Sequence, residues 1–231
     1  MRSIKAIFTK QAKDMLKNPM VLVMFVVFPA VALVMTQLIA LPNDEISNNM
    51  FVTMMAAIFA GMGLVTASSS VIAEDIERKS LRFLIIAGVK PHQYLLGTGG
   101  FMLLAGAITS VLFALIGDFS GAEIAKFLTI MITGTAASII LGTAIGMLSK
   151  NQQAATAIGM PVAMILGFTP MIAAFDSKVE KVANFLYTQQ INVIINDFAL
   201  SLGKPLLIIA ANGAVFMVLF IIAYRKRGLK G

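Results

Sequence analysis

Six apolar segments, each about 20 residues long, constrain the fold of this chain more than any other feature. None of the six contains Asp, Glu, Lys, Arg or His. A helix of about 20 residues rises about 30 Å, which matches the hydrocarbon core of a bilayer. We therefore expect an all-α, polytopic membrane protein with one transmembrane domain over residues 1–231. The predicted spans are residues 20–41, 50–72, 95–116, 127–148, 154–175 and 206–224.

The composition supports the same class of protein. Hydrophobic residues make up 58% of the chain and charged residues 13%, whereas a typical soluble domain has about 45–50% and about 25%. These values exclude a disordered chain and argue against a soluble globule. The chain has no cysteine, which removes disulfides, thiolate metal sites and cysteine nucleophiles from consideration.

The positive charge of the chain is concentrated on one side of the predicted membrane. Fourteen of the 18 Lys and Arg residues fall in the N-terminal segment, the loops after the second and fourth spans, and the C-terminal tail. Basic loops normally face the cytoplasm, so we expect a multi-pass protein of the plasma membrane with both termini cytoplasmic. The net charge of +7 is then a topology signal, and we expect no nucleic-acid partner.

The first 17 residues form a basic, amphipathic segment. The periodicity of its apolar residues predicts a helix that lies in the inner membrane interface, with its apolar stripe toward lipid and its lysines near anionic headgroups. The alternative is a basic flank that only fixes the topology. The residues that carry the pattern are Ile4, Ile7, Phe8, Lys10, Lys13, Met15 and Lys17.

The loop over residues 73–93 carries charges and large apolar residues together. Its acids precede its bases, which suits the dipole of a short helix, and Gly88 is expected to end that helix. Ile76, Ser80 and Phe83 would share one face. Such a helix could dock on another protein, or it could rest on the membrane surface. The candidate docking residues are Glu74, Asp75, Glu77, Arg78, Lys79, Ser80, Leu81 and Arg82.

Two further patterns concern the outer loop and helix packing. Apolar residues recur at helical spacing within residues 176–205, which predicts two short amphipathic or re-entrant helices that either cap a pathway or form an inert lid. In the fourth span, small residues repeat every four positions and form a ridge on which another helix can pack closely. The ridge consists of Gly134, Ser138, Gly142 and Gly146.

The chain lacks the residues that would power or catalyse a reaction. The predicted spans contain no ionisable group for a proton relay, and the single histidine, His92, lies in a loop. The sequence has no G-x-x-x-x-G-K-[ST] phosphate-binding motif. We therefore expect no catalytic, metal or cofactor site in this chain, and any uphill transport must draw its energy from another protein.

The arrangement resembles the membrane-spanning permease subunits of type-2 ABC exporters. That family has an N-terminal amphipathic helix, six spans, a polar coupling helix between spans two and three, and short re-entrant helices before the last span. The local similarity covers residues 77–97, E-R-K-S-L-R-F-L-I-I-A-G-V-K-P-H-Q-Y-L-L-G. The positions that match the family pattern are Glu77, Ser80, Leu81, Leu84, Val89 and Gly97.

The resemblance implies a function for the whole chain. Two permeases, identical or homologous, would pair around a pathway, and each would dock one of two cytoplasmic ATPases that bind ATP and Mg²⁺. The loop from Glu74 to Arg82 would transmit the ATPase motion, and an amphipathic or hydrophobic cargo (a peptide, drug or lipid) would leave the cell. The alternatives are a stand-alone secondary carrier or channel, and a membrane scaffold or sensor that transports nothing.

Overall fold

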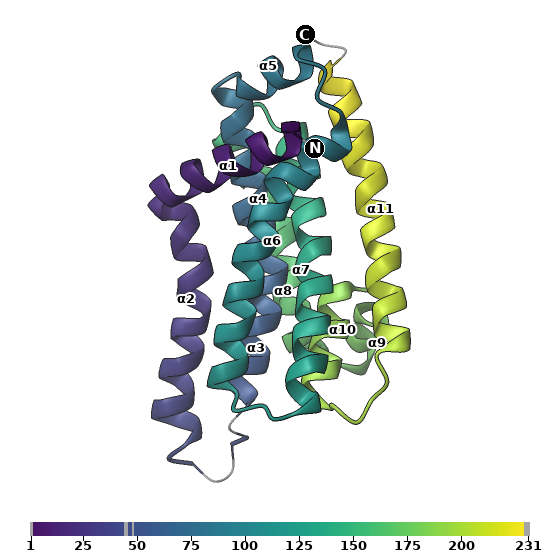
Figure 1. Cartoon of the computed structure of the whole chain (residues 1–231). Helices are drawn as coiled ribbons and strands as arrows, with labels where there is room; N and C mark the ends of the chain where they lie inside the picture. The colour runs from purple at the N-terminus through teal and green to yellow at the C-terminus, as the bar shows by residue number, and fades with distance from the viewer. Residues whose placement is uncertain (1, 44–45, 48, 229–231) are drawn as a thin grey trace.

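The computed structural model describes residues 2–43, 46–47 and 49–228. Within these ranges every regular element is a helix, and the long helices lie side by side as a bundle (Figure 1). The elements are α1 (Arg2–Lys17), α2 (Pro19–Met35), η1 (Thr36–Ala40), α3 (Met50–Ile58), η2 (Phe59–Gly63), α4 (Leu64–Glu77), α5 (Ser80–Ile86), α6 (Pro91–Ile116), α7 (Ala122–Leu148), α8 (Gln152–Ala173), α9 (Ser177–Ala183), α10 (Tyr187–Asn196) and α11 (Gly203–Gly228).

Six helical stretches of the described chain are long and apolar enough to cross a membrane, which confirms the predicted all-α, polytopic architecture. They are Val21–Ala40, Met50–Glu77, Pro91–Ile116, Ala122–Leu148, Gln152–Ala173 and Gly203–Arg227. Several helices continue past the apolar residues from which the spans were predicted. Span 2 runs to Glu77 and span 3 already begins at Pro91, because backbone hydrogen bonds do not need apolar side chains and proline favours the first position of a helix.

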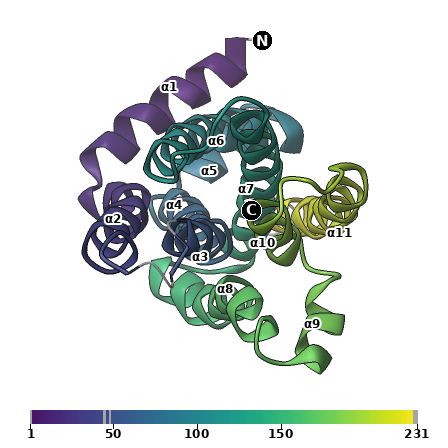
Figure 2. The ribbon, with the colours of Figure 1, turned by 90° about the horizontal axis from the view of Figure 1, so that it is seen from below.

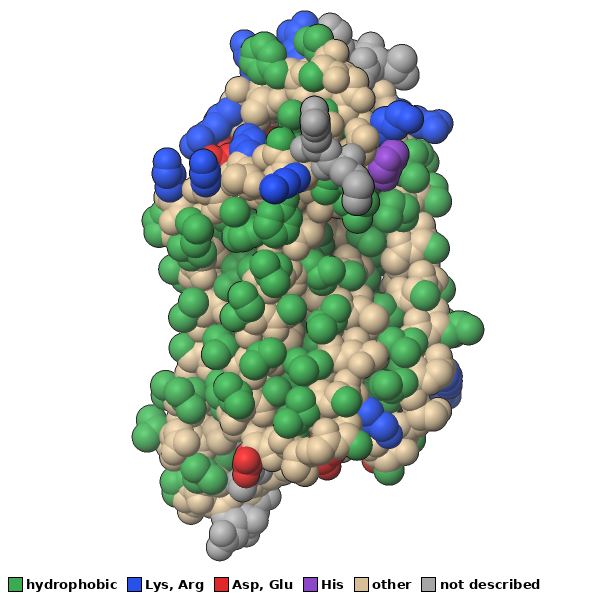
Figure 3. Space-filling model, viewed as in Figure 1, with side chains coloured by type: hydrophobic (Ala, Val, Ile, Leu, Met, Phe, Trp, Pro, Cys, Tyr) green, Lys and Arg blue, Asp and Glu red, His purple; other side chains and the backbone are tan. Residues whose placement is uncertain are grey.

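Charge divides the bundle into two different ends. Lys and Arg gather where α1, α5 and the last turns of α11 lie, and a broad apolar band follows below them (Figure 3). We call this the basic end, and we call the end that carries α9 and the beginning of α3 the opposite end (Figure 1). An apolar band between two polar ends is what a bilayer requires of a spanning protein.

Helix α7 is the central packing element. It contacts α4, α6, α10 and α11, and in the view along the bundle it lies between α6 and α11 (Figure 2). The ridge predicted from its small residues packs inside the chain. A Cβ on Gly146 would lie 2.6 Å from the Cβ of Ile72 on α4, and the hydroxyls of Ser138 and Tyr187 on α10 form a hydrogen bond of 2.9 Å.

The other two glycines of the ridge contact the same two helices, one glycine against each helix. A Cβ on Gly142 would collide with the Ser68 hydroxyl on α4, and a Cβ on Gly134 would collide with Ile191 on α10. The ridge therefore receives α4 near the basic end and α10 near the opposite end, and its role in this structure is packing within one chain.

Two backbone features of the spans were not expected from the sequence. Span 1 ends in the π-helical turn η1, and span 2 contains the π-helical turn η2 between α3 and α4. Within η2, a Cβ on Gly61 would lie only 2.6 Å from the backbone nitrogen of Gly167 on α8. Spans 2 and 5 therefore touch backbone to backbone, which the lack of a side chain on both glycines allows.

The loop over residues 176–205 folds into two short helices, α9 and α10. Tyr187 and Ile191 on α10 are fully buried, and α10 contacts α3, α7, α8 and α11. The apolar pattern that predicted the second helix runs from Ile191 through Phe198 to Leu202, but α10 ends at Asn196. The helix stops because the Asp197 carboxylate accepts the Ala199 amide at 2.9 Å, and such a local bond competes with the next helical turn.

We predict that Gly142→Ala lowers the free energy of unfolding by about 1–3 kcal/mol, because a new Cβ overpacks the α4–α7 contact. Thermal unfolding of the purified chain in detergent measures this effect. Gly213→Ala on α11 is the matched control, because nothing lies within 4 Å of its added Cβ. Equal melting temperatures for both variants would contradict the assignment of the ridge to close packing.

Candidate functional site

The segment between spans 2 and 3 folds as a break followed by a short helix, and this corrects the sequence interpretation of one helix with its acids first. Helix α4 continues through Glu74 and Asp75 to Glu77, the chain turns at Arg78 and Lys79, and α5 begins at Ser80. Lys79 has a left-handed backbone conformation with φ of 59°, which ends the α-helix. The acids therefore occupy the last turn of α4, where the helix dipole disfavours them.

Each of these acids has its own partner, which offsets the unfavourable position. Glu74 forms an ion pair with Arg78 at 2.7 Å and accepts a hydrogen bond from the Asn18 side chain at 3.1 Å. Glu77 accepts the backbone N–H of Gln152 at 3.3 Å, at the start of α8. The last turn of α4 is thus tied to the beginnings of two other spans.

Asp75 is the centre of a buried polar cluster and is only 5% exposed. Its Oδ1 accepts from the Lys10 ammonium of α1 at 2.5 Å and from the Ser80 hydroxyl of α5 at 2.7 Å. Its Oδ2 accepts from the hydroxyl of the fully buried Tyr94 of α6 at 2.8 Å. Three donors, one of them cationic, compensate a carboxylate that has lost its water.

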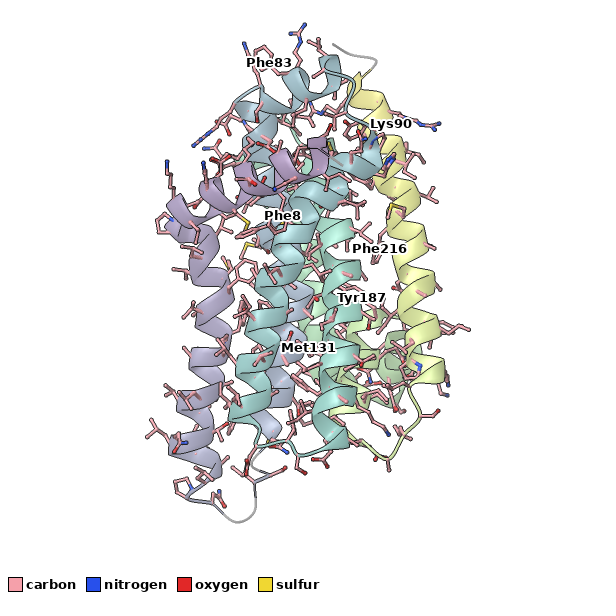
Figure 4. All side chains as sticks on the ribbon, viewed as in Figure 1. Phe8, Phe83, Lys90, Met131, Tyr187 and Phe216 are labelled. Carbon is pink, nitrogen blue, oxygen red and sulfur yellow. The ribbon has the colours of Figure 1, made fainter. Side chains whose placement is uncertain are left out.

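Helix α1 docks on the bundle through the residues that the sequence placed against lipid. Ile7 is 3% exposed and Met15 is 1% exposed, and a Cβ on Gly97 of α6 would lie 2.6 Å from the Cβ of Ile7. Phe8 packs edge-to-face on Phe101 at 5.5 Å (Figure 4). The expectation that the stripe faces the acyl chains is therefore wrong at these positions, and Gly97 and Gly100 of α6 make room for Ile7 and Phe8.

The lysines of α1 differ in their surroundings. Lys13 and Lys17 are exposed, and Ile4 is half-buried. Lys10 lies between Asp75 and Asp14. The Lys10 ammonium is 3.1 Å from the Asp14 carboxylate. Partial burial lowers the pKa of Lys10, but the Asp75 and Asp14 carboxylates together outweigh burial and hold the pKa above its usual value, so Lys10 stays protonated at neutral pH.

A second set of contacts fastens α5 and its connection to α6. The segment ends as a Schellman motif, in which the Gly88 and Val89 amides donate to Ile85 and Leu84 at 3.0 Å each. Gly88 has a positive φ of 80°, which glycine adopts without strain, so Gly88 ends the helix as predicted. The Tyr224 hydroxyl of α11 donates to the Val89 carbonyl at 2.8 Å.

The outer face of α5 is apolar and exposed. Phe83 is 70% exposed and Ile86 is 73% exposed, and Figure 4 shows Phe83 at the basic end of the bundle. Leu81 points inward and is 3% exposed. Large apolar side chains exposed next to each other on one helix face form a candidate contact surface for another molecule.

The structure separates the eight predicted docking residues into three groups by burial. Asp75 and Leu81 are buried, Glu74 and Ser80 are half-buried, and Glu77, Arg78, Lys79 and Arg82 are exposed. The two most exposed apolar residues of α5, Phe83 and Ile86, lay in the predicted loop but outside the candidate set. Their three-residue spacing within a seven-residue helix was the signal that could have identified them.

Comparison with known families decides the identity of this architecture. The family model of the ABC-2 type transporter matches residues 2–188, which cover α1 to the beginning of α10. The chain belongs to the ABC-2 type transporter family. No curated protein matches the chain. As a permease of this family the chain is the membrane component of an ABC transporter, a generally non-catalytic role that implies association with an ATP-binding ABC ATPase.

The ABC-2 chain also holds an apolar cavity near the opposite end of the bundle, between α3, α8 and α10. Its volume is about 320 Å³. Methionines and a phenylalanine dominate its lining, together with the side chains of Thr53, Asn192 and Asn196. In the part of the chain that the structure describes, no group of three or more His, Asp or Glu residues could hold a metal ion.

We predict that Asp75→Asn in this ABC-2 chain lowers the free energy of unfolding by about 2 kcal/mol, because hydrogen bonds to a charged group contribute this much. Asp14→Asn is the matched control. Asp14 contacts the same lysine, but its side chain is 40% exposed, so we expect a loss below about 1 kcal/mol. Thermal unfolding in detergent compares the two, and equal losses would contradict the central role of Asp75.

Proposed function

We propose that this ABC-2 chain is the permease subunit of an exporter whose cytoplasmic ATPase docks on α5. The observation that carries the proposal is the exposed pair Phe83 and Ile86 at the basic end. Bases gather on cytoplasmic surfaces, so the basic end would face the cytoplasm, with both termini on that side and the bundle in the plasma membrane. The exposed bases beside the pair, such as Lys79, would surround the apolar contact with a polar rim.

The ATPase would supply the energy that this chain lacks. It would bind ATP and Mg²⁺, and two copies would serve two permeases, identical or homologous, that pair around the pathway. Span 1 (Val21–Ala40) and span 5 (Gln152–Ala173) contain no ionisable residue. These two spans therefore offer no side chain that could carry protons down a gradient.

We predict that the double substitution Phe83→Ala and Ile86→Ala removes the ATPase from the purified complex, because large central side chains contribute about 2 kcal/mol or more each to an interface. Copurification in mild detergent, with quantitative mass spectrometry, measures the loss. The matched control is Phe185→Ala with Ile172→Ala, two exposed residues of the opposite end. Unchanged ATPase recovery from the α5 double variant would refute docking at this surface.

The cargo we propose is amphipathic or hydrophobic, such as a peptide, drug or lipid. Support comes from the cavity between α3, α8 and α10, which combines an apolar lining with two asparagines and a threonine. Such a lining suits a ligand with an apolar body and a few hydrogen-bonding groups. Its methionines, among them Met54 and Met171, adapt to ligands of different shape.

We predict that Ala174→Phe, which places a ring in this cavity, raises the concentration of amphipathic compound needed to stimulate the ATPase by about tenfold, because the ring removes part of the contact surface. The assay is ATP hydrolysis by the reconstituted complex with a panel of peptides and drugs. Ala210→Phe on α11, at an exposed site away from the cavity, is the control. An unchanged stimulation curve for Ala174→Phe would exclude this cavity from the pathway.

A further inference from the structure

Asp75 contacts three elements besides its own helix. Lys10 belongs to α1, Ser80 to α5 and Tyr94 to α6. Helix α1 packs on α6, and α5 packs on the end of α4. The carboxylate therefore stands at the junction between the N-terminal helix and the helix that carries Phe83 and Ile86.

The geometry leaves the carboxylate little freedom. Both oxygens are occupied, because Oδ1 accepts from Lys10 and Ser80 and Oδ2 accepts from Tyr94. The Ser80 hydroxyl also lies 3.0 Å from the backbone carbonyl of Asp75, which fixes the start of α5 to the end of α4. A displacement of α5 must therefore carry the carboxylate with it.

We propose that Asp75 is a positioning residue that makes α1 follow α5, and so passes a displacement of α5 to the first span. The proposal rests on the proposed docking of an ATPase on α5. The physical reason is electrostatic: a buried carboxylate that separates from its cation loses a large stabilisation, so Lys10 and its helix move with Asp75.

The connection from α1 to the first span is direct. Asn18 follows the last residue of α1 and caps α2, because its side-chain oxygen accepts the Val21 amide at 3.4 Å. The amide group of the same side chain donates to Glu74 at 3.1 Å, one residue before Asp75. A rotation of the end of α4 therefore reaches the beginning of α2 by two polar contacts, through Lys10 and through Asn18.

Distances between spin labels in the complete permease–ATPase complex test this inference. The chain has no native cysteine, so cysteines can be introduced in pairs at Thr9 on α1, Ala87 at the end of α5 and Ala122 at the start of α7, all of which are exposed. The complex, with the ATPase that copurifies with the chain, is placed in lipid nanodiscs. Pulsed electron paramagnetic resonance then compares the nucleotide-free state with the ATP-trapped state.

In the spin-labelled chain that keeps Lys10 and Asp75, we expect α1 and α5 to shift together. ATP changes the Thr9–Ala122 and Ala87–Ala122 distances, while the Thr9–Ala87 distance stays constant. In Lys10→Met and Asp75→Asn, the Ala87–Ala122 distance still changes, but Thr9 no longer follows, so the Thr9–Ala87 distance shifts and its distribution broadens. Lys13→Met is the matched control, because Lys13 is an exposed lysine of the same helix, and it should behave as the native chain does.

Two results would overturn the proposal in distinguishable ways. If Thr9 follows Ala87 in Lys10→Met and Asp75→Asn as it does in the native chain, α1 moves with α5 without the carboxylate, and the role assigned to Asp75 is wrong while docking stands. If ATP leaves the Ala87–Ala122 distance unchanged in the native complex, α5 receives no displacement, and both the docking proposal and the route through Asp75 fail. ATPase copurification with Lys10→Met at native levels shows that the complex is intact.

Discussion

Close contact between helix backbones is the constraint on which this structure depends. Inside a bilayer, apolar side chains gain little from leaving lipid for another helix, so association needs close packing and hydrogen bonds. Helix α7 supplies both, since Gly142 and Gly146 admit α4 and the Ser138 hydroxyl pairs with Tyr187 of α10. Every other span is placed relative to this central helix or to a helix that packs on it.

The charged groups act at the ends of the bundle, where they tie helix termini together. Arg227 near the end of α11 donates to the carbonyls of Met147 and Ser149, at the end of α7. A cation at this place satisfies carbonyl groups that the helix leaves open and complements its dipole. With the cluster around Asp75, it gives the basic end a polar framework, while close packing and a few hydrogen bonds such as Ser138–Tyr187 hold the apolar middle.

The sequence was sufficient to predict the spans, the N-terminal helix, the end of α5 at Gly88 and the small-residue ridge, because these depend on local periodicity and on glycine. It was not sufficient to predict which face of α1 meets protein, since the Ile7 contact needs Gly97, a residue 90 positions away. The same holds for Asp75. As one acid among several in a charged loop, it was predicted to be a docking residue, and only the fold brings Lys10, Ser80 and Tyr94 around it.

The π-helical turn η2 divides span 2 into two halves that pack against different sets of helices. One residue corresponds to about 100° of rotation in an α-helix, so an inserted residue turns everything beyond it to a new face. The half before the turn, α3, contacts α2, α8 and α10, whereas the half after it, α4, contacts α7, α8 and the short helix α5. A single membrane span thus contributes to two sites: its first half lines the cavity, and its second half carries Asp75 and its cluster.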